Sequence, residues 1–147
     1  MSAQVTGREA TAAPLAPERR RLRAPVAFAG GAAVLAVTLA VRSPYDSGSY
    51  GYCPFLTLTG HYCPGCGGLR AMHDLLRLDV AAAWDMNPLV VVAVPLVVAA
   101  WLVWMWRARR GRPVTAPSTG AVVALAVVLL AFTVARNVPA LAPWLAP

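Results

Sequence analysis

The chemistry available to this chain is concentrated in three cysteines, Cys53, Cys63 and Cys66, which lie in one short segment. Cys63 and Cys66 have C-x-x-C spacing, which lets two thiols close a small disulfide ring or supply two ligands to one metal ion. Cys53 leaves one thiol unpaired if a single disulfide forms. The segment is therefore interpreted in three ways: a structural disulfide, a metal site, or a pair of thiols active in disulfide exchange.

The metal interpretation needs a fourth ligand, and the two histidines of the chain are the candidates. Cys53, Cys63 and Cys66 together with either His61 or His73 would form a Cys3His set, which suits zinc. Zinc is the only cofactor that the sequence indicates, and one C-x-x-C pair alone is a weak signal for it.

The elements that position this segment are apolar. The chain is 59% hydrophobic and 13% charged, whereas soluble domains are about 25% charged. Three stretches nearly free of charge, residues 25–41, 88–106 and 120–136, are close to the length that crosses a bilayer. These features predict an all-α integral membrane protein with three transmembrane helices and a lipid bilayer as its surroundings.

Arginines predict the orientation. Nine of the 13 basic residues, all arginine, lie before the first stretch or just after the second, which makes residues 1–24 a disordered cytoplasmic tail and residues 107–119 a cytoplasmic loop. Residues 42–87, with the cysteines, and the tail 137–147 are then extracytoplasmic. A multi-pass protein of the cell membrane follows, and nucleic acid is not expected as a partner because these arginines adjoin apolar helices.

The extracytoplasmic loop is expected to hold one amphipathic helix over residues 67–78. Arg70, His73, Asp74 and Arg77 would form a polar stripe facing solvent. Residues 53–60, partly β-branched and bounded by proline and glycine, are predicted to be extended.

A series of motifs follows in a fixed order: Cys53-Pro54-Phe55, Thr59-Gly60, Cys63-Pro64-Gly65-Cys66-Gly67, Arg70-Ala71, Leu75-Leu76, Asp79 and Asn87-Pro88-Leu89. Their order and spacing resemble the domain-of-unknown-function 2752 family of small bacterial membrane proteins. The family pattern runs C-P-F, T-G, C-P-x-C-G-x-T-R, a leucine-rich helix, G-D and N-P-L, and this chain departs from it at Leu69, where Thr is common, and at Leu78, where Gly is common. The Leu78 departure predicts a less abrupt turn. The resemblance implies a membrane protein with a cysteine motif, but no activity. The residues expected to shape the motif are Pro54, Pro64, Gly65, Gly67, Arg70, Asp79, Asn87 and Pro88.

Two functions from different classes stay open. The first is a non-enzymatic membrane component, assembling with other membrane proteins, whose loop is held by a disulfide or a metal ion. The alternative is a membrane thiol–disulfide oxidoreductase that uses Cys63 and Cys66. The odd number of cysteines favours the first, so an enzyme is the less expected outcome.

Overall fold

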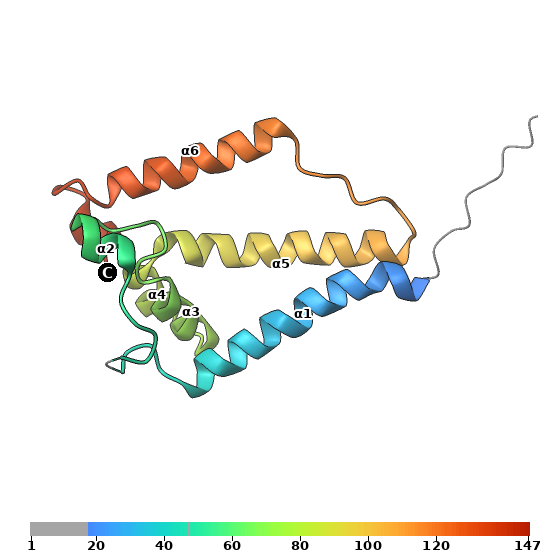
Figure 1. Ribbon diagram of the computed structural model, residues 1–147, viewed down its shortest axis with the longest axis horizontal. Coiled ribbons are helices and arrows are strands. Elements are labelled where there is room, and N and C mark those ends of the chain that lie inside the picture. Colours follow the sequence, from blue (N-terminus) through green and yellow to red (C-terminus); the bar gives the residue numbers. More distant parts are fainter. Residues whose placement is uncertain (1–17, 47) are drawn as a thin grey trace, which may run out of the picture.

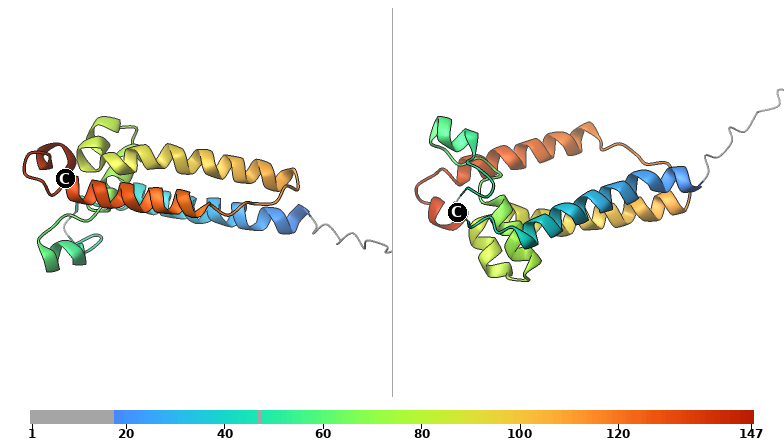
Figure 2. Two further views of the ribbon diagram at one scale, coloured as in Figure 1. Left: turned by 90° about the horizontal axis from the view of Figure 1, so that it is seen from above. Right: turned by 60° about the horizontal axis from the view of Figure 1, so that its bottom comes forward.

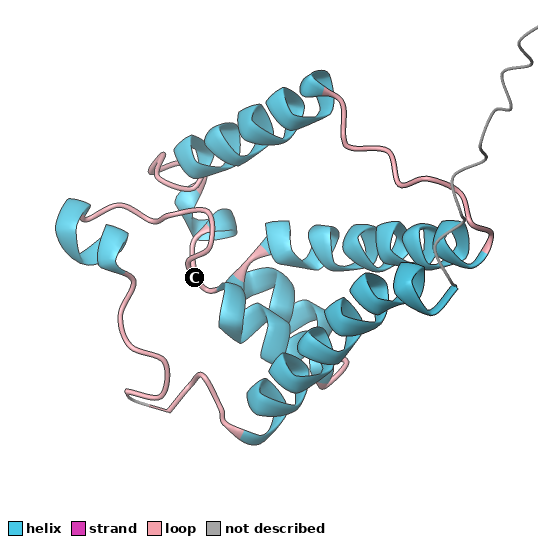
Figure 3. Ribbon diagram, turned by 45° about the vertical axis from the view of Figure 1, so that its right-hand side comes forward, coloured by secondary structure: helices cyan, strands magenta, loops and turns pink. Residues whose placement is uncertain are grey.

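Every regular element in the described part of the chain is a helix (Figure 3). The computed structural model describes residues 18–46 and 48–147. In order, the helices are α1 (Glu18–Val41), α2 (Pro54–Thr59), α3 (Gly68–Leu76), α4 (Val80–Met86), α5 (Pro88–Arg109), α6 (Thr119–Ala135) and α7 (Ala142–Leu145) (Figure 1). The prediction of an all-helical chain is confirmed for these residues.

Two helices are long and apolar enough to cross a membrane. The segments Arg19–Val41 and Pro88–Arg109 have 23 and 22 residues, which at about 1.5 Å per residue extend about 33–35 Å, against a hydrocarbon core of about 30 Å. α6 is equally apolar but has only 17 residues, or about 26 Å. Residues 18–46 and 48–147 thus contain two candidate spans, where the sequence predicted three.

These long helices leave most of their apolar surface uncovered. Leu35 of α1, Leu96 of α5 and Leu130 of α6 are 64–66% exposed. α1 packs along α5, whereas α6 diverges from that pair and approaches the other helices at its C-terminal end (Figures 1 and 2). Exposed apolar surface of this extent is typical of a protein that contacts lipid or other apolar helices, and it supports a membrane protein.

The short helices gather at one end of the long ones and form what we call the cap, consisting of α2, α3, α4, α7 and the loops between them (Figure 1). α3 packs on α1, α4 and α5. Asn87 begins α5 as predicted, because its side chain accepts a hydrogen bond from the Val90 amide at 3.2 Å and Pro88 follows at the first helical position. Asp79 begins α4 in the same way, accepting from Ala82 N at 3.0 Å.

Several boundaries differ from those predicted. α1 begins at Glu18, inside the segment 1–24 expected to be a tail, because residues 18–24 are mostly strong helix formers; residues 1–17 lie outside the described part. The prediction that residues 53–60 are extended is wrong. Pro54 at the first position and Gly60, with a left-handed φ of 70°, delimit helix α2 instead.

The turn between α3 and α4 is also different from the expectation. Leu78 has a φ of +63°, the left-handed conformation that glycine adopts most easily. The predicted less abrupt turn is therefore wrong: the turn keeps a glycine-like backbone although leucine occupies it.

Candidate metal centre

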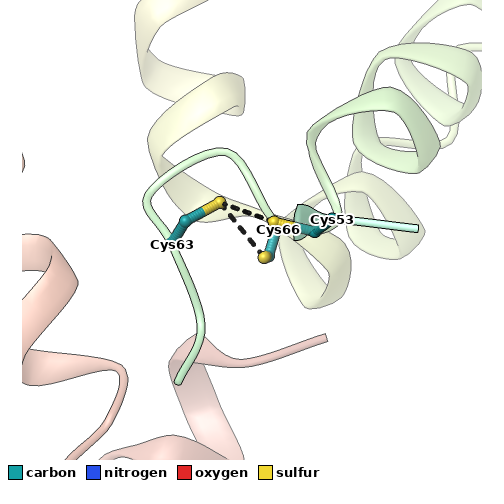
Figure 4. A group of neighbouring side chains, drawn as sticks. All are labelled: Cys53, Cys63 and Cys66. Atoms are coloured by element: carbon teal, nitrogen blue, oxygen red, sulfur yellow. Dashed lines mark hydrogen bonds between the residues drawn. The ribbon is translucent and has the colours of Figure 1, made fainter. Parts of the chain in front are cut away.

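The three cysteine sulfurs meet at one point in the cap (Figure 4). Cys53 precedes α2, while Cys63 and Cys66 lie in the turn that leads into α3. The Sγ atom of Cys63 is 3.5 Å from that of Cys53 and 3.2 Å from that of Cys66, and all three lie within 4.8 Å of one another. Both short distances exceed the roughly 2.05 Å of a disulfide bond, and the three cysteines are free thiols.

This spacing matches that of ligands around one metal ion. Sulfurs bound tetrahedrally to zinc at about 2.3 Å lie about 3.8 Å apart, close to the separations observed here. The donor set consists of three soft thiol sulfurs, which favours Zn²⁺ or another thiophilic ion over Mg²⁺ or Ca²⁺. The residues present therefore fit a metal ion.

The backbone of the cysteine turn requires glycine at one position. Gly67 has a φ of +76°, and a Cβ atom added there would overlap the carbonyl oxygen of Met86. Any side chain would thus meet both an unfavourable backbone conformation and the end of α4. Within the turn, the amide of Cys66 donates to the Cys63 carbonyl at 3.2 Å, which closes the C-x-x-C loop.

Two buried side chains bind the carbonyl oxygens of this turn. Arg136, at the end of α6, donates from Nη1 to Cys63 O at 2.9 Å and to Pro64 O at 3.4 Å, and from Nη2 to Cys66 O at 3.0 Å. Asn87 donates from Nδ2 to Pro64 O and to Cys66 O, both at 3.0 Å. Both side chains are fully buried. The start of α5 and the end of α6 therefore fix the conformation of the turn.

The residue after Arg136 makes a second contact with the cysteine turn. Asn137 pairs with the backbone of Tyr62, accepting from its amide at 2.8 Å and donating to its carbonyl at 2.9 Å. The Arg136 guanidinium also lies over the rings of Tyr62 and Phe132, at 5.8 and 5.0 Å from their centroids. The cysteine turn is thus attached to α6 through consecutive residues.

Arg136 and Asn137 were not identified from the sequence. The one available signal was that Arg136 is a single charge ending an apolar stretch, with no acidic residue after Asp85 in the chain. Its Nε atom is buried without a hydrogen-bond partner, and no ion pair to it occurs within the described residues. Since a buried charge is costly without compensation, the site favours negative charge beside it.

The three thiols are not equivalent. Burial raises the pKa of the Cys66 thiol to about 12. The pKa of the Cys53 thiol is lowered, chiefly by a hydrogen bond from the backbone amide of Leu56 and then by the Cys63 thiol. Cys53 therefore becomes a thiolate more easily than Cys66.

The histidines lie apart from this group. The group of candidate ligands among the described residues comprises the three cysteines only. His61 is exposed, and its Nδ1 atom is 2.7 Å from the Thr59 carbonyl. His73 is 3% exposed, and its Nδ1 atom is 2.7 Å from the Leu39 carbonyl of α1. The structure does not bring either histidine to the sulfurs as a fourth ligand.

The polar stripe of α3 is divided between solvent and the interior. The expectation that His73 and Asp74 face solvent is wrong, because both are buried. Asp74 accepts a hydrogen bond from the Tyr45 hydroxyl at 2.5 Å, and Arg70 lies over the Tyr45 ring. Only Arg70 and Arg77 are exposed as predicted. The stripe therefore attaches α3 to α1 and the loop after it.

Comparison with known proteins adds one finding. No curated protein and no solved structure matches the chain. One family model does match part of the chain, and that part includes all three cysteines and Asn87, but not Arg136. Residues 53–101 match the family described as "Protein of unknown function (DUF2752)", which confirms the resemblance inferred from the cysteine motif.

Proposed function

We propose that this chain is a non-enzymatic component of the cell membrane, whose extracytoplasmic cap binds one divalent thiophilic metal ion, with zinc as the first candidate. Cys53, Cys63 and Cys66 supply the ligands. The observation that carries the proposal is the convergence of three sulfurs, from two separate segments, at distances suited to one ion. Bound metal would join α2 to the cysteine turn and so hold the cap together.

Charge balance favours a divalent ion. Three thiolates and one divalent ion carry a net charge of −1, and the buried guanidinium of Arg136 carries +1. The pair is then neutral, which satisfies the requirement that buried charges be compensated. A monovalent ion such as Cu⁺ with three thiolates would leave a surplus negative charge beside Arg136. The same balance predicts that any fourth ligand is neutral, such as water or an uncharged side chain of a partner protein.

The topology supports an extracytoplasmic cap. Eight arginines lie at the opposite end of α1 and α5: Arg19, Arg20, Arg21, Arg23, Arg107, Arg109, Arg110 and Arg112. We call this end the arginine end; it lies away from the cap in both views of Figure 2. The positive-inside rule assigns the arginine end to the cytoplasm. α6 then returns from the cytoplasm as a third, short span, because its last residues contact the cap.

The alternative is a thiol–disulfide oxidoreductase. The observation that favours it is the central position of Cys63, whose sulfur lies within 3.5 Å of both other sulfurs. A disulfide could therefore form with either neighbour and leave the third thiol free. Such an enzyme would contain one disulfide and no stoichiometric metal when isolated without reductant.

One experiment separates the two functions. The full chain is purified in mild detergent without reductant or chelator, and metal content and thiol state are measured together by elemental analysis and intact mass. We expect about one divalent ion per chain and no disulfide. One disulfide with one free thiol and no metal would contradict the metal proposal and favour the oxidoreductase. As a control, Cys66→Ser should lose the metal, whereas replacing a histidine, His61→Ala, should retain it.

A further inference from the structure

We infer that the arginine end carries a binding site for the phosphate group of an anionic phospholipid, formed between the start of α1 and the segment that follows α5. A hollow of about 310 Å³ lies there, lined by Arg21, Ala108, Gly111, Arg112, Pro113 and Val114. Volumes of this size are at the lower end of the range for ligand pockets. The site is at the opposite end from the cysteines and is independent of the proposed metal centre.

The backbone brings the arginines of the hollow together. Gly111 ends α5 with a left-handed φ of +65°, and the amide of Arg112 donates back to the Arg107 carbonyl at 3.0 Å, as in a Schellman motif. A Cβ atom at Gly111 would overlap the guanidinium of Arg21. The missing side chain therefore lets Arg21 of α1 approach the end of α5.

A third arginine, outside the lining, is hydrogen-bonded to the backbone of Pro113, which lines the hollow. Arg107 donates from Nη2 to the Pro113 carbonyl at 3.1 Å, while its Nε atom is buried without a hydrogen-bond partner among the described residues. Arg112 lies over the ring of Trp106, 5.3 Å from its centroid, which restrains its guanidinium. The lining of the hollow thus carries two guanidinium groups, those of Arg21 and Arg112.

The positive charge of the hollow and its place beside an aromatic belt indicate a lipid as the occupant. The sequence contains no acidic residue between Arg19 and Tyr45 or after Asp85, so no carboxylate side chain lies in the two segments that form the hollow. Arginine binds phosphate through two parallel hydrogen bonds. Trp101, Trp104 and Trp106 lie on the preceding turns of α5, as in the aromatic belts found at the level of lipid headgroups. A phosphate here is thus most readily supplied by the membrane itself.

The test compares lipids on the purified full chain in detergent by native mass spectrometry. Dioleoyl phosphatidylglycerol should remain bound and dioleoyl phosphatidylcholine should not. The double variant Arg21→Gln/Arg112→Gln should bind phosphatidylglycerol at least about tenfold more weakly, since both guanidinium groups of the hollow lose their charge-assisted hydrogen bonds to the phosphate. Arg109→Gln removes a charge at the same end but not from the hollow, and should bind as the native chain does.

Three results would overturn the inference. The first is equal retention of both lipids, and the second is a double variant that binds like Arg109→Gln. The third is displacement of the lipid by millimolar inorganic phosphate, if phosphate without lipid raises the melting temperature of the protein as much as the lipid does. That result would identify a free anion as the ligand. If the double variant does not fold, Arg112→Gln alone, at an exposed residue, should still weaken binding about tenfold through the loss of its hydrogen bonds to the phosphate.

Discussion

Replacement of Arg136 should weaken metal binding far more than it weakens the fold. In the variant Arg136→Met, an apolar chain of similar length occupies the site and the donors to Cys63 O, Pro64 O and Cys66 O are lost. None of these carbonyls becomes unpaired, because Asn87 still donates to the last two and the Cys66 amide still donates to the first. The change therefore removes hydrogen bonds without leaving buried acceptors unsatisfied.

The expected loss of zinc affinity follows from what Arg136 contributes without metal and with metal. Without metal, two good hydrogen bonds worth about 1 kcal/mol each are lost, and removal of an uncompensated buried charge offsets part of that loss. We expect the free energy of unfolding of the metal-free protein to fall by about 1 kcal/mol or less. With metal, Arg136, which is hydrogen-bonded to the backbone of two of the ligands, lies beside a cluster of net charge −1. Two opposite unit charges on the order of 6 Å apart attract each other by about 3 kcal/mol at an effective dielectric constant of about 20. Zinc affinity should then fall about 10- to 100-fold, the range typical of groups that support metal ligands.

Two measurements check this prediction. Zinc affinity is obtained by competition with a chromophoric chelator, and stability by thermal unfolding in detergent with and without zinc. Arg136→Lys keeps the charge but cannot reach two carbonyls with a planar fork, so its affinity should be intermediate. Arg77→Met, which removes an exposed arginine of the cap, should bind zinc as the native chain does. An Arg136→Met protein that binds zinc with native affinity would refute the charge-balance reasoning.

Three further predictions concern the cap. Gly67→Ala should lower the free energy of unfolding by at least about 2 kcal/mol, because left-handed backbone costs a non-glycine residue about 1–2 kcal/mol and the new Cβ overlaps Met86 O. Gly65→Ala, whose Cβ would meet only Cys63 Sγ at 3.8 Å, is the control. Equal melting temperatures of the two variants would contradict the argument. Leu78→Gly should stabilise the chain by roughly 0.5–1 kcal/mol by relieving a φ of +63°, whereas Leu78→Ala should not; both are read from thermal unfolding. Burial and the hydrogen bond to Asp74 raise the pKa of Tyr45 to about 12 from an ordinary value of 10.0. The unfolded chain therefore loses this proton at a lower pH than the folded chain, and the stability contributed by Tyr45 is lost as the pH rises from about 10 to 12. Absorbance at 295 nm should show one late-titrating tyrosine that Tyr45→Phe removes, and identical titration curves of the two proteins would contradict the assignment.

Local patterns in the sequence determined much of the fold. Apolar runs predicted helices α1, α5 and α6, because a segment in lipid must satisfy its own backbone hydrogen bonds. The pair Asn87-Pro88 predicted the start of α5, since capping depends on neighbouring residues alone. The three cysteines were identified by type and spacing. Where local signals competed, at residues 53–60, the proline and glycine at the two ends decided the structure against β-branched residues.

The tertiary structure decided what surrounds the cysteines. Cys53 joins Cys63 and Cys66 because α2 folds back toward the turn before α3, and no local pattern predicts that return. Arg136 reaches Cys63 and Cys66 across about half of the chain, because the residues that follow α6 lie against the cysteine turn. His73 was expected at the surface but is buried, with its ring against the Leu39 carbonyl of α1. The sequence thus determined which residues carry the chemistry, while long-range packing determined which of them are buried together and which charge lies beside them.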